Sequence, residues 1–175
     1  VCTASEIKKI YNHLSISVEE LKSSIKGKVF LLTDTDAQLL EFETMEGIEQ
    51  HLKCRRLVNV GESTKLVKIT SNPKSPKTDI EDALNGKLFH RILLSFKSDN
   101  EELSFLDEQE RDEISSYYAL NLRPNEYSKL DKFFSKENGI FKVDFANKYV
   151  EELEKNDYKT PDWIEDIKCF SCITS

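Results

Sequence analysis

Runs of apolar residues in the first half of the chain predict buried β-strands. The clearest is Lys28–Thr33, KVFLLT, in which the apolar residues are consecutive rather than alternating. A strand with this pattern is usually covered on both faces, as in a parallel sheet. Shorter apolar runs predict two further strands, at Arg55–Asn59 and Lys65–Ile69.

Apolar residues at helical spacing predict helices around these strands. The expected ranges are 5–14, 17–27, 44–53, 80–93, 141–155 and 160–170. The acidic stretch between residues 95 and 136 is also expected to be helical, with its charges on a solvated face. Phe145 and Tyr149 belong to the apolar stripe of one late helix, and Trp163 is expected to pack inward from the last one.

The order of these elements predicts the fold class. Strands alternate with helices in the first half, which favours an α/β fold with a largely parallel sheet flanked by helices, and the C-terminal half is helical. A length of 175 residues suits one domain with a substantial core. We expect an α/β core over residues 1–94 and a helical extension over residues 95–175 that completes the domain.

Composition and charge narrow the classes of function. No run approaches the ~20 apolar residues of a membrane helix, and the N-terminus shows no secretory signal pattern, so we expect a cytoplasmic protein. The net charge of −7 argues against a surface that coats nucleic acid, because phosphate contacts need Lys and Arg. A metal-dependent nuclease stays open, since bound cations reverse the sign of a carboxylate cluster.

The four cysteines include one C-x-x-C pair, Cys169 and Cys172. No second pair and no histidine at matching spacing completes a zinc site in the sequence. We interpret the pair as small apolar residues on a C-terminal helix of a protein from a reducing compartment.

Two carboxylates follow the first predicted strand, Asp34 and Asp36 in the sequence TDTD. Ligands of open α/β sheets bind at the carboxyl ends of the strands, and strand alternation places both side chains on one side. Neighbouring carboxylates repel each other unless a cation lies between them, and hard oxygen ligands suit Mg²⁺ or Mn²⁺. The pair is a candidate metal site; the alternative is a helix-capping Asp followed by an Asp in a turn.

Two further segments carry candidate chemistry. Glu81 and Asp82 stand in the first turn of a predicted helix, where the helix dipole alone also favours acidic residues. Lys142 stands at the start of another helix, where a cation is poorly matched to the dipole. We expect an anion beside it, either a phosphate or a carboxylate. The alternative is an ordinary surface lysine whose stem passes Phe141.

In order and spacing, these segments resemble those of topoisomerase–primase (Toprim) domains. The segments are VFLLTDTD, CRRLVNV with LVKI, TDIEDALNGKLFHRIL, GIFKVDFANKYVEEL and PDWIEDIKCF. The resemblance covers most of the chain from about Val29 onward. It is closest to the Toprim nuclease domains of the OLD (overcoming lysogenization defect) family and of related phage-defence proteins, such as the nuclease subunit of Gabija.

The resemblance implies a DNA endonuclease that nicks or cleaves with two Mg²⁺ or Mn²⁺ ions. Asp34 and Asp36 match the metal-binding D-x-D of the family. Glu81, with Asp82 beside it, matches the acidic residue that completes the metal cluster. Lys142 matches the lysine that contacts the scissile phosphate. The two metals would clamp the attacking and leaving oxygens.

The family pattern also opens with a strand that ends in a glutamate, and no such element precedes Lys28. We therefore expect either that this strand and its catalytic Glu are missing from the chain or that the domain is degenerate, and that the activity belongs to a larger parent protein. The resemblance further implies an ATPase domain or subunit and an oligomer. Arg55 and Arg56 are candidates for contacts with the DNA backbone, although an ion pair at a strand edge explains them equally well.

Two other functions compete with the nuclease. A haloacid-dehalogenase-like phosphatase also has a strand ending in D-x-D, but it expects Thr or Val where this chain has Gln38, and its lysine and acidic pair come in the opposite order. A non-enzymatic assembly module on a Toprim scaffold would use the acidic stretch Asp99–Glu113 and the aromatic segment SSYYALNL for its contacts. A measurement of Mn²⁺ binding distinguishes the two, because an intact metal site should bind Mn²⁺ and a pure scaffold should not.

Overall fold

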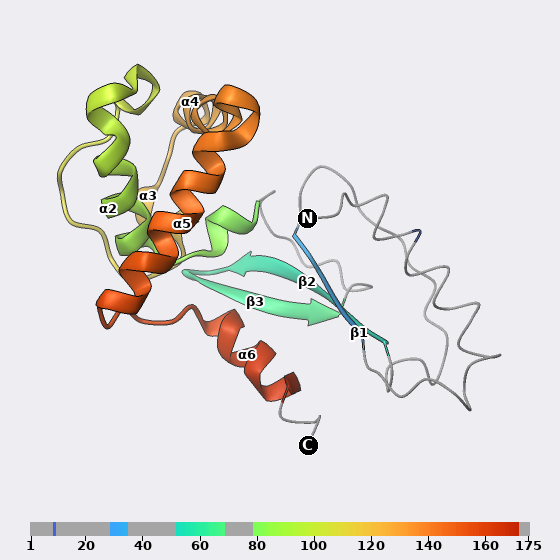
Figure 1. Cartoon of the computed structure of the whole chain (residues 1–175). Coiled ribbons are helices and arrows are strands. Elements are labelled where there is room, and N and C mark those ends of the chain that lie inside the picture. Colours follow the sequence, from blue (N-terminus) through green and yellow to red (C-terminus); the bar gives the residue numbers. More distant parts are fainter. Residues whose placement is uncertain (1–8, 10–28, 35–51, 69–78, 172–175) are drawn as a thin grey trace.

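The computed structural model describes residues 9, 29–34, 52–68 and 79–171 (Figure 1). Within them the fold is mixed α/β, as the sequence predicts. The helices expected over residues 5–14 and 17–27 lie, except for Lys9, outside the described residues, as does most of the helix expected over 44–53. Leu52 and Lys53, at the end of that last range, belong to a strand instead.

The described strands form one sheet in the order β1-β2-β3. They are β1 (Val29–Thr33), β2 (Leu52–Val60) and β3 (Ser63–Lys68). β1 runs parallel to β2, whereas β2 and β3 are antiparallel. The prediction of a largely parallel sheet is wrong for the second pair, because a two-residue turn joins these strands and only a hairpin can be that short. Gly61 in this turn takes the positive φ, 59°, that such turns require.

The single helix expected over residues 80–93 is two elements in the structure. A 3₁₀ turn, η2 (Ile80–Ala83), is followed by extended backbone and then by α2 (Gly86–Phe96). Asn85 separates them, because its side chain accepts a hydrogen bond from the backbone N–H of Leu88 at 3.1 Å and so caps α2.

The rest of the described chain is mostly helical, with irregular connections between the helices. The elements are η3 (Lys97–Asp99), η4 (Glu101–Leu103), α3 (Ser116–Leu120), α4 (Pro124–Ser135), η5 (Lys136–Gly139), α5 (Ile140–Lys155) and α6 (Asp162–Ser171). Residues 104–115 and 121–123 are irregular, so the prediction of helix throughout 95–136 is wrong at both stretches. None of the helices in the described part of the chain is long and apolar enough to span a bilayer.

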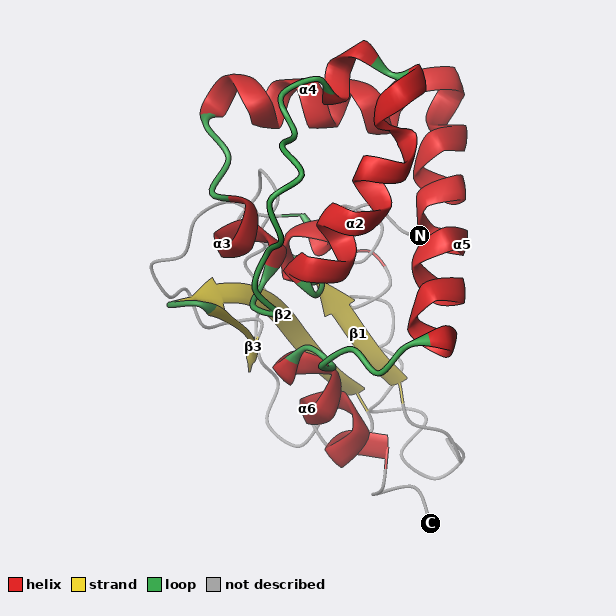
Figure 2. Ribbon diagram, turned by 90° about the vertical axis from the view of Figure 1, so that its left-hand side faces the viewer, coloured by secondary structure: helices red, strands yellow, loops and turns green. Residues whose placement is uncertain are grey.

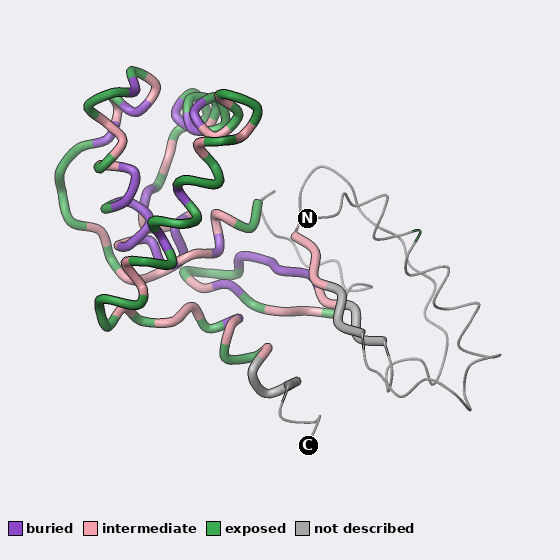
Figure 3. Tube along the Cα trace, in the orientation of Figure 1, coloured by how far each residue is buried: buried purple, intermediate pink, exposed green. Residues whose placement is uncertain are grey.

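Helices α2 to α5 form one body beside the sheet, and α6 lies along the sheet separately (Figure 2). The interior of the helical body is the main region of burial (Figure 3). Its aromatic rings meet edge to face, as between Phe89 and Phe145 with centroids 4.9 Å apart. Burying a side chain of this size contributes roughly 1.5–3 kcal/mol. The predicted inward stripe of α5 is confirmed, since Phe145 and Tyr149 are both buried in this core.

A smaller apolar cluster joins α6 to the sheet. It contains Leu57 of β2, Ala83 of η2 and Trp163 of α6. The Trp163 indole N–H also donates to the carbonyl of Ala83 at 2.8 Å, which confirms that this side chain packs inward. The expected division of the chain after residue 94 falls inside α2, whose buried residues share one core with α4 and α5.

Candidate functional site

Asp34 lies directly after β1, at the carboxyl end of that strand, and is half-buried. β1 pairs with β2 through Thr33 and Arg56, so Asp34 continues from the paired part of the sheet. Asp36, the second residue of the D-x-D, lies outside the described residues. The structure therefore describes one of the two carboxylates expected at this strand end.

The acidic pair Glu81 and Asp82 lies in η2, a turn held by hydrogen bonds at both ends. The backbone N–H of Asp79 donates to a carboxylate oxygen of Asp82 at 3.0 Å. The hydroxyls of Ser115 and Ser116 donate to the carbonyls of Asp82 and Glu81 at 2.5 and 2.6 Å. The Glu81 carbonyl also accepts a bond from the backbone N–H of Leu84 at 3.3 Å, so the Ser116 hydroxyl adds to the hydrogen bonds of the turn itself. The start of α3 thus fixes the position of the acidic turn.

Lys142 lies in the first turn of α5, and its ammonium contacts a carboxylate oxygen, Oε1, of Glu81. The anion expected beside this lysine is therefore a carboxylate in the structure. The Glu81 side chain is only 13% exposed, whereas the Lys142 side chain is 56% exposed. The other carboxylate oxygen of Glu81, Oε2, is buried and has no hydrogen-bond partner within the described structure.

The charge of Asp34 acts on Lys142 together with that of Glu81. Burial by itself would lower the pKa of Lys142, but the hydrogen bond and the charge of Glu81 raise it above its usual value. The charges of Asp79 and Asp34 raise this pKa further. Asp34, which follows β1, and Glu81 of η2 therefore both act on the ammonium of Lys142 in α5.

A cavity of about 230 Å³ opens beside this ion pair. Its lining residues are Asp79, Glu81, Asp82, Tyr127, Leu130, Asp131, Phe134, Ser135 and Lys142. Burial raises the pKa of Asp82 to about 7; the hydrogen bond from Asp79 opposes this shift, and the charges of Asp79, Glu81 and Asp131 add to it. Burial and the charge of Asp82 likewise raise the pKa of Tyr127. Asp82 can therefore exchange a proton near neutral pH.

The donor chemistry of this site suits a hard divalent cation, but the donors are not gathered into a complete set. Asp34 and Glu81 offer carboxylate oxygens, and the buried Oε2 of Glu81 has unused lone pairs. Across the described residues, no group of three or more His, Cys, Asp or Glu side chains is arranged to hold a metal ion. Asp36 would have to complete the set from outside that part of the chain.

The two arginines proposed as phosphate contacts lie on β2, and they differ in how far they are buried. Arg56 is only 4% exposed, and Arg55 is half-buried. Burial lowers the pKa of Arg56. Strand alternation places Arg56 on the opposite face of β2 from Leu57, which contacts the α6 cluster. Contact of either arginine with DNA stays a prediction.

Sequence reasoning missed the residues that hold the site together. Ser115 and Ser116 bind the acidic turn, and Asp131 and Tyr127 of α4 line the cavity. The two serines stand just before an aromatic pair, where a helix N-cap is a common reading. Their contact with residues 81 and 82 spans more than thirty positions, which no local pattern reveals.

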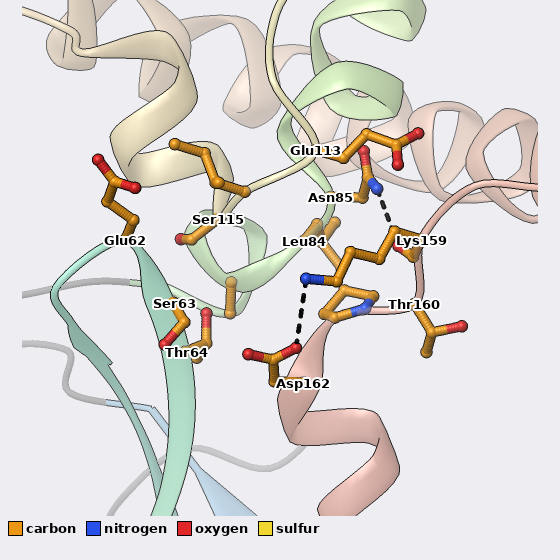
Figure 4. Close-up of a pocket in the computed structure, with 13 residues that line it drawn as sticks. Glu62, Ser63, Thr64, Leu84, Asn85, Glu113, Ser115, Lys159, Thr160 and Asp162 are labelled. Carbon is orange, nitrogen blue, oxygen red and sulfur yellow. Dashed lines mark hydrogen bonds and ion pairs between the residues drawn. The ribbon is translucent and has the colours of Figure 1, made fainter.

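A second cavity, of about 210 Å³, lies between the β2–β3 turn, the start of α2 and the connection from α5 to α6 (Figure 4). Asn85 donates from its side-chain amide to the carbonyl of Lys159 at 2.8 Å on its wall, and the Lys159 ammonium lies 3.7 Å from Asp162. Glu62 and Glu113 also line this cavity, so its rim carries both signs of charge. The positive charge of Lys159 is already paired with the carboxylate of Asp162, three residues later in the sequence.

Comparison of the chain with known protein families, with curated proteins and with solved structures found no match.

Proposed function

We propose that this chain carries a Toprim-like, divalent-metal-dependent site for DNA phosphodiester hydrolysis, as in OLD-type nucleases. The observation that supports it is the contact between Lys142 and Glu81, with Asp34 near enough to act on the same ammonium. A phosphoryl-transfer site needs carboxylates that hold metal cations and a lysine that binds the negative charge of the phosphate. Carboxylates beside a lysine supply both.

The roles follow from the chemistry of each side chain. Asp34 and Glu81, with Asp36 and Asp82, would hold Mg²⁺ or Mn²⁺, which when bound stabilises the attacking and leaving oxygens of an in-line displacement. Lys142 is more than half exposed, so its ammonium can reach a phosphate that approaches from solvent.

Other parts of the proposal concern the protein as a whole. We propose that DNA is the substrate, that Arg55 and Arg56 contact its backbone, and that an ATPase domain or subunit and an oligomeric state accompany the activity. A role in defence against phage rests on the resemblance to OLD and Gabija nuclease domains.

A specific observation favours the assembly module as a second candidate. Ile140, Val143 and Val150 of α5 are 52%, 59% and 54% exposed. Positions spaced by three and seven residues share one face of a helix. This apolar face lies opposite the buried stripe of α5 and is of the kind that partner contacts use.

The deciding experiment is Mn²⁺-dependent nicking of supercoiled plasmid. The full chain is compared with its Asp34→Asn and Lys142→Ala variants, with Lys155→Ala at the other end of α5 as a charge-matched control. We expect the first two variants to lose at least tenfold in rate, since each removes a charge at the reacting centre, and the control to nick at the normal rate. Equal nicking by all four proteins, or no nicking with any metal, would leave the assembly module as the better proposal.

A further inference from the structure

Helix α5 presents apolar side chains to solvent as well as to the core. Figure 2 shows this helix at the edge of the helical body, beside α2. Ile140, Val143 and Val150 are each more than half exposed, although Phe145 and Tyr149 of the same helix are buried. At 3.6 residues per turn, the three exposed side chains lie within one half of the helix circumference and point away from the buried stripe.

The spacing of these residues fits contact with a second helix. Ile140, Val143, Asn147 and Val150, which we call the α5 face, follow one another at intervals of three, four and three residues. This is the repeat of a coiled-coil seam, and Asn147 is exposed together with its apolar neighbours. The α5 face extends over about 15 Å of the helix axis, so one partner helix laid along it would cover all four side chains.

The charged side chains beside the α5 face all have one sign. Asp144, Glu151 and Glu154 are exposed, and helical spacing puts them within the same half of the circumference as the apolar residues. None of the lysines of α5 lies in that half. The surface around the apolar row is therefore acidic.

The lysines of α5 are occupied on the other side of the helix. The Lys142 ammonium contacts Glu81, and the Lys148 ammonium lies 3.9 Å from the ring centroid of Phe96. Lys155 pairs with two glutamates of its own helix at 3.7 Å. These contacts hold the positive charges of the helix away from the α5 face.

We propose that the α5 face docks an amphipathic helix of a partner protein whose apolar row is flanked by Lys or Arg. Opposite charges beside two apolar rows favour association and fix the register, and like charges reject the wrong partner. A second copy of this chain does not fit, because pairing of the face with itself would bring only acidic residues together. The inference rests on the assembly module, the second candidate function, and uses no residue of the proposed nuclease site.

The test is fluorescence anisotropy of a labelled synthetic peptide titrated with the full chain. The probe is an amphipathic helix as long as α5, with leucines at the spacing of the α5 face and lysines at the flanking positions. A second peptide has the same leucines and has glutamates in place of the lysines. Comparison of the two peptides separates the apolar contact from the contact between charges.

Two double variants test the two parts of the α5 face. The valine double variant, Val143→Gln with Val150→Gln, removes apolar side chains and keeps good helix formers. Its control is Val60→Gln, at an exposed apolar residue of β2. The acidic double variant is Asp144→Asn with Glu154→Gln. Its control, with the same change in net charge at exposed positions elsewhere, is Glu101→Gln with Glu108→Gln.

We expect the lysine peptide to bind the natural chain and both controls equally. The valine double variant should bind it at least tenfold more weakly, because two buried apolar contacts are lost. The acidic double variant should bind it about threefold more weakly at low salt, which is the size of effect that exposed ion pairs have. The glutamate peptide should not bind.

The other outcomes overturn the inference in distinguishable ways. If neither peptide binds, or if the valine double variant binds normally, the α5 face is not a docking site. If the valines matter but both peptides bind equally, the basic partner is overturned and an apolar contact face of the assembly module stands.

Two further measurements identify the other possible occupants of the α5 face. A dimer in sedimentation of the full chain that the valine double variant breaks would make a second copy the occupant. A lower melting temperature of the valine double variant, with no peptide bound by the natural chain, would make a segment of the same chain the occupant. Either result overturns the docking of a basic helix, and the nicking assay decides the nuclease independently of both.

Discussion

The hydroxyl oxygen of Tyr149 accepts a hydrogen bond from the backbone N–H of Asn85 at 3.1 Å. Both residues are buried, and they connect the middle of α5 to the start of α2. Burial raises the pKa of Tyr149 to about 12, although the bond from Asn85 opposes the shift, so the hydroxyl is neutral at physiological pH. The bond satisfies a backbone donor that water does not reach.

Replacing Tyr149 by Phe should therefore destabilise the fold more than removing a tyrosine hydroxyl at the surface would. The Asn85 N–H would stay buried without an acceptor, which costs about 1–3 kcal/mol in the free energy of unfolding. Urea denaturation followed by circular dichroism measures this loss. Tyr158→Phe is the control, because the Tyr158 hydroxyl accepts its bond from Arg91 at an exposed position. Equal losses in the two variants would show that burial of this bond does not matter.

Asn85 should be sensitive to the chemistry of its side chain as well. Asn85→Ala removes the acceptor for the Leu88 N–H and the donor to the Lys159 carbonyl. We expect a loss of about 1–2 kcal/mol in unfolding free energy from the missing cap. Asn85→Asp keeps the acceptor and should recover part of it. An Asp variant as unstable as the Ala variant would mean that the cap is not the source of the stability.

Gly86 permits the close packing of α2 against α3. A Cβ placed on Gly86 would lie 2.2 Å from the Cβ of Ala119 and 3.0 Å from the carbonyl oxygen of Ile114. Gly86→Ala should thus force the two helices apart and lower the free energy of unfolding by about 1–3 kcal/mol. The double variant with Ala119→Gly should be more stable than Gly86→Ala alone. A chemical denaturation series on Gly86→Ala, Ala119→Gly and the double variant tests the pair, and failure of the rescue would contradict the steric explanation.

Asp82 should make stability depend on pH in the neutral range. Its pKa in the folded protein is about 7, above the ordinary value of 3.8, so the folded state keeps a proton that the unfolded state has lost. Stability from this group is therefore present at low pH and falls as the pH rises from about 4 to about 7. Asp82→Asn, which still offers an oxygen to the Asp79 N–H, should remove this fall, worth roughly 4 kcal/mol for a pKa raised from 3.8 to about 7. Melting temperatures across that range measure it, and parallel pH profiles for both proteins would refute the assignment.

The sequence predicted those features that a local pattern encodes. The helix predicted at 141–155 shows its period of apolar residues directly, and the structure has α5 at Ile140–Lys155 with Phe145 and Tyr149 buried. The break between η2 and α2 was not predicted, because the apolar pattern runs through it. Its cause is Asn85, whose partners include Tyr149 and Lys159, residues distant in the sequence.

In the candidate site, too, the sequence predicted what one residue and its own element encode, and not the contacts between distant elements. The mismatch of Lys142 with a helix start indicates that an anion lies nearby, and this follows from one residue and its element. That the anion belongs to Glu81 depends on how α5 packs against η2, which no spacing in the sequence encodes. Burial of Arg56 was missed for the same reason, since a charged residue on a strand is ordinarily expected at the surface.

The segment from Glu81 to Asn85 contacts α5 at two separate points, through Lys142 and through Tyr149. These two residues are about 10 Å apart along the helix axis, or roughly two turns. A helix attached at one point can still rotate about that point, whereas attachment at two points fixes both its tilt and its direction. A tilt of about 10° around Tyr149 would move the start of α5 by roughly 2 Å, given that axial separation. The geometry at the Lys142 end of this helix is therefore set as much by a buried tyrosine hydroxyl as by the charges that meet there.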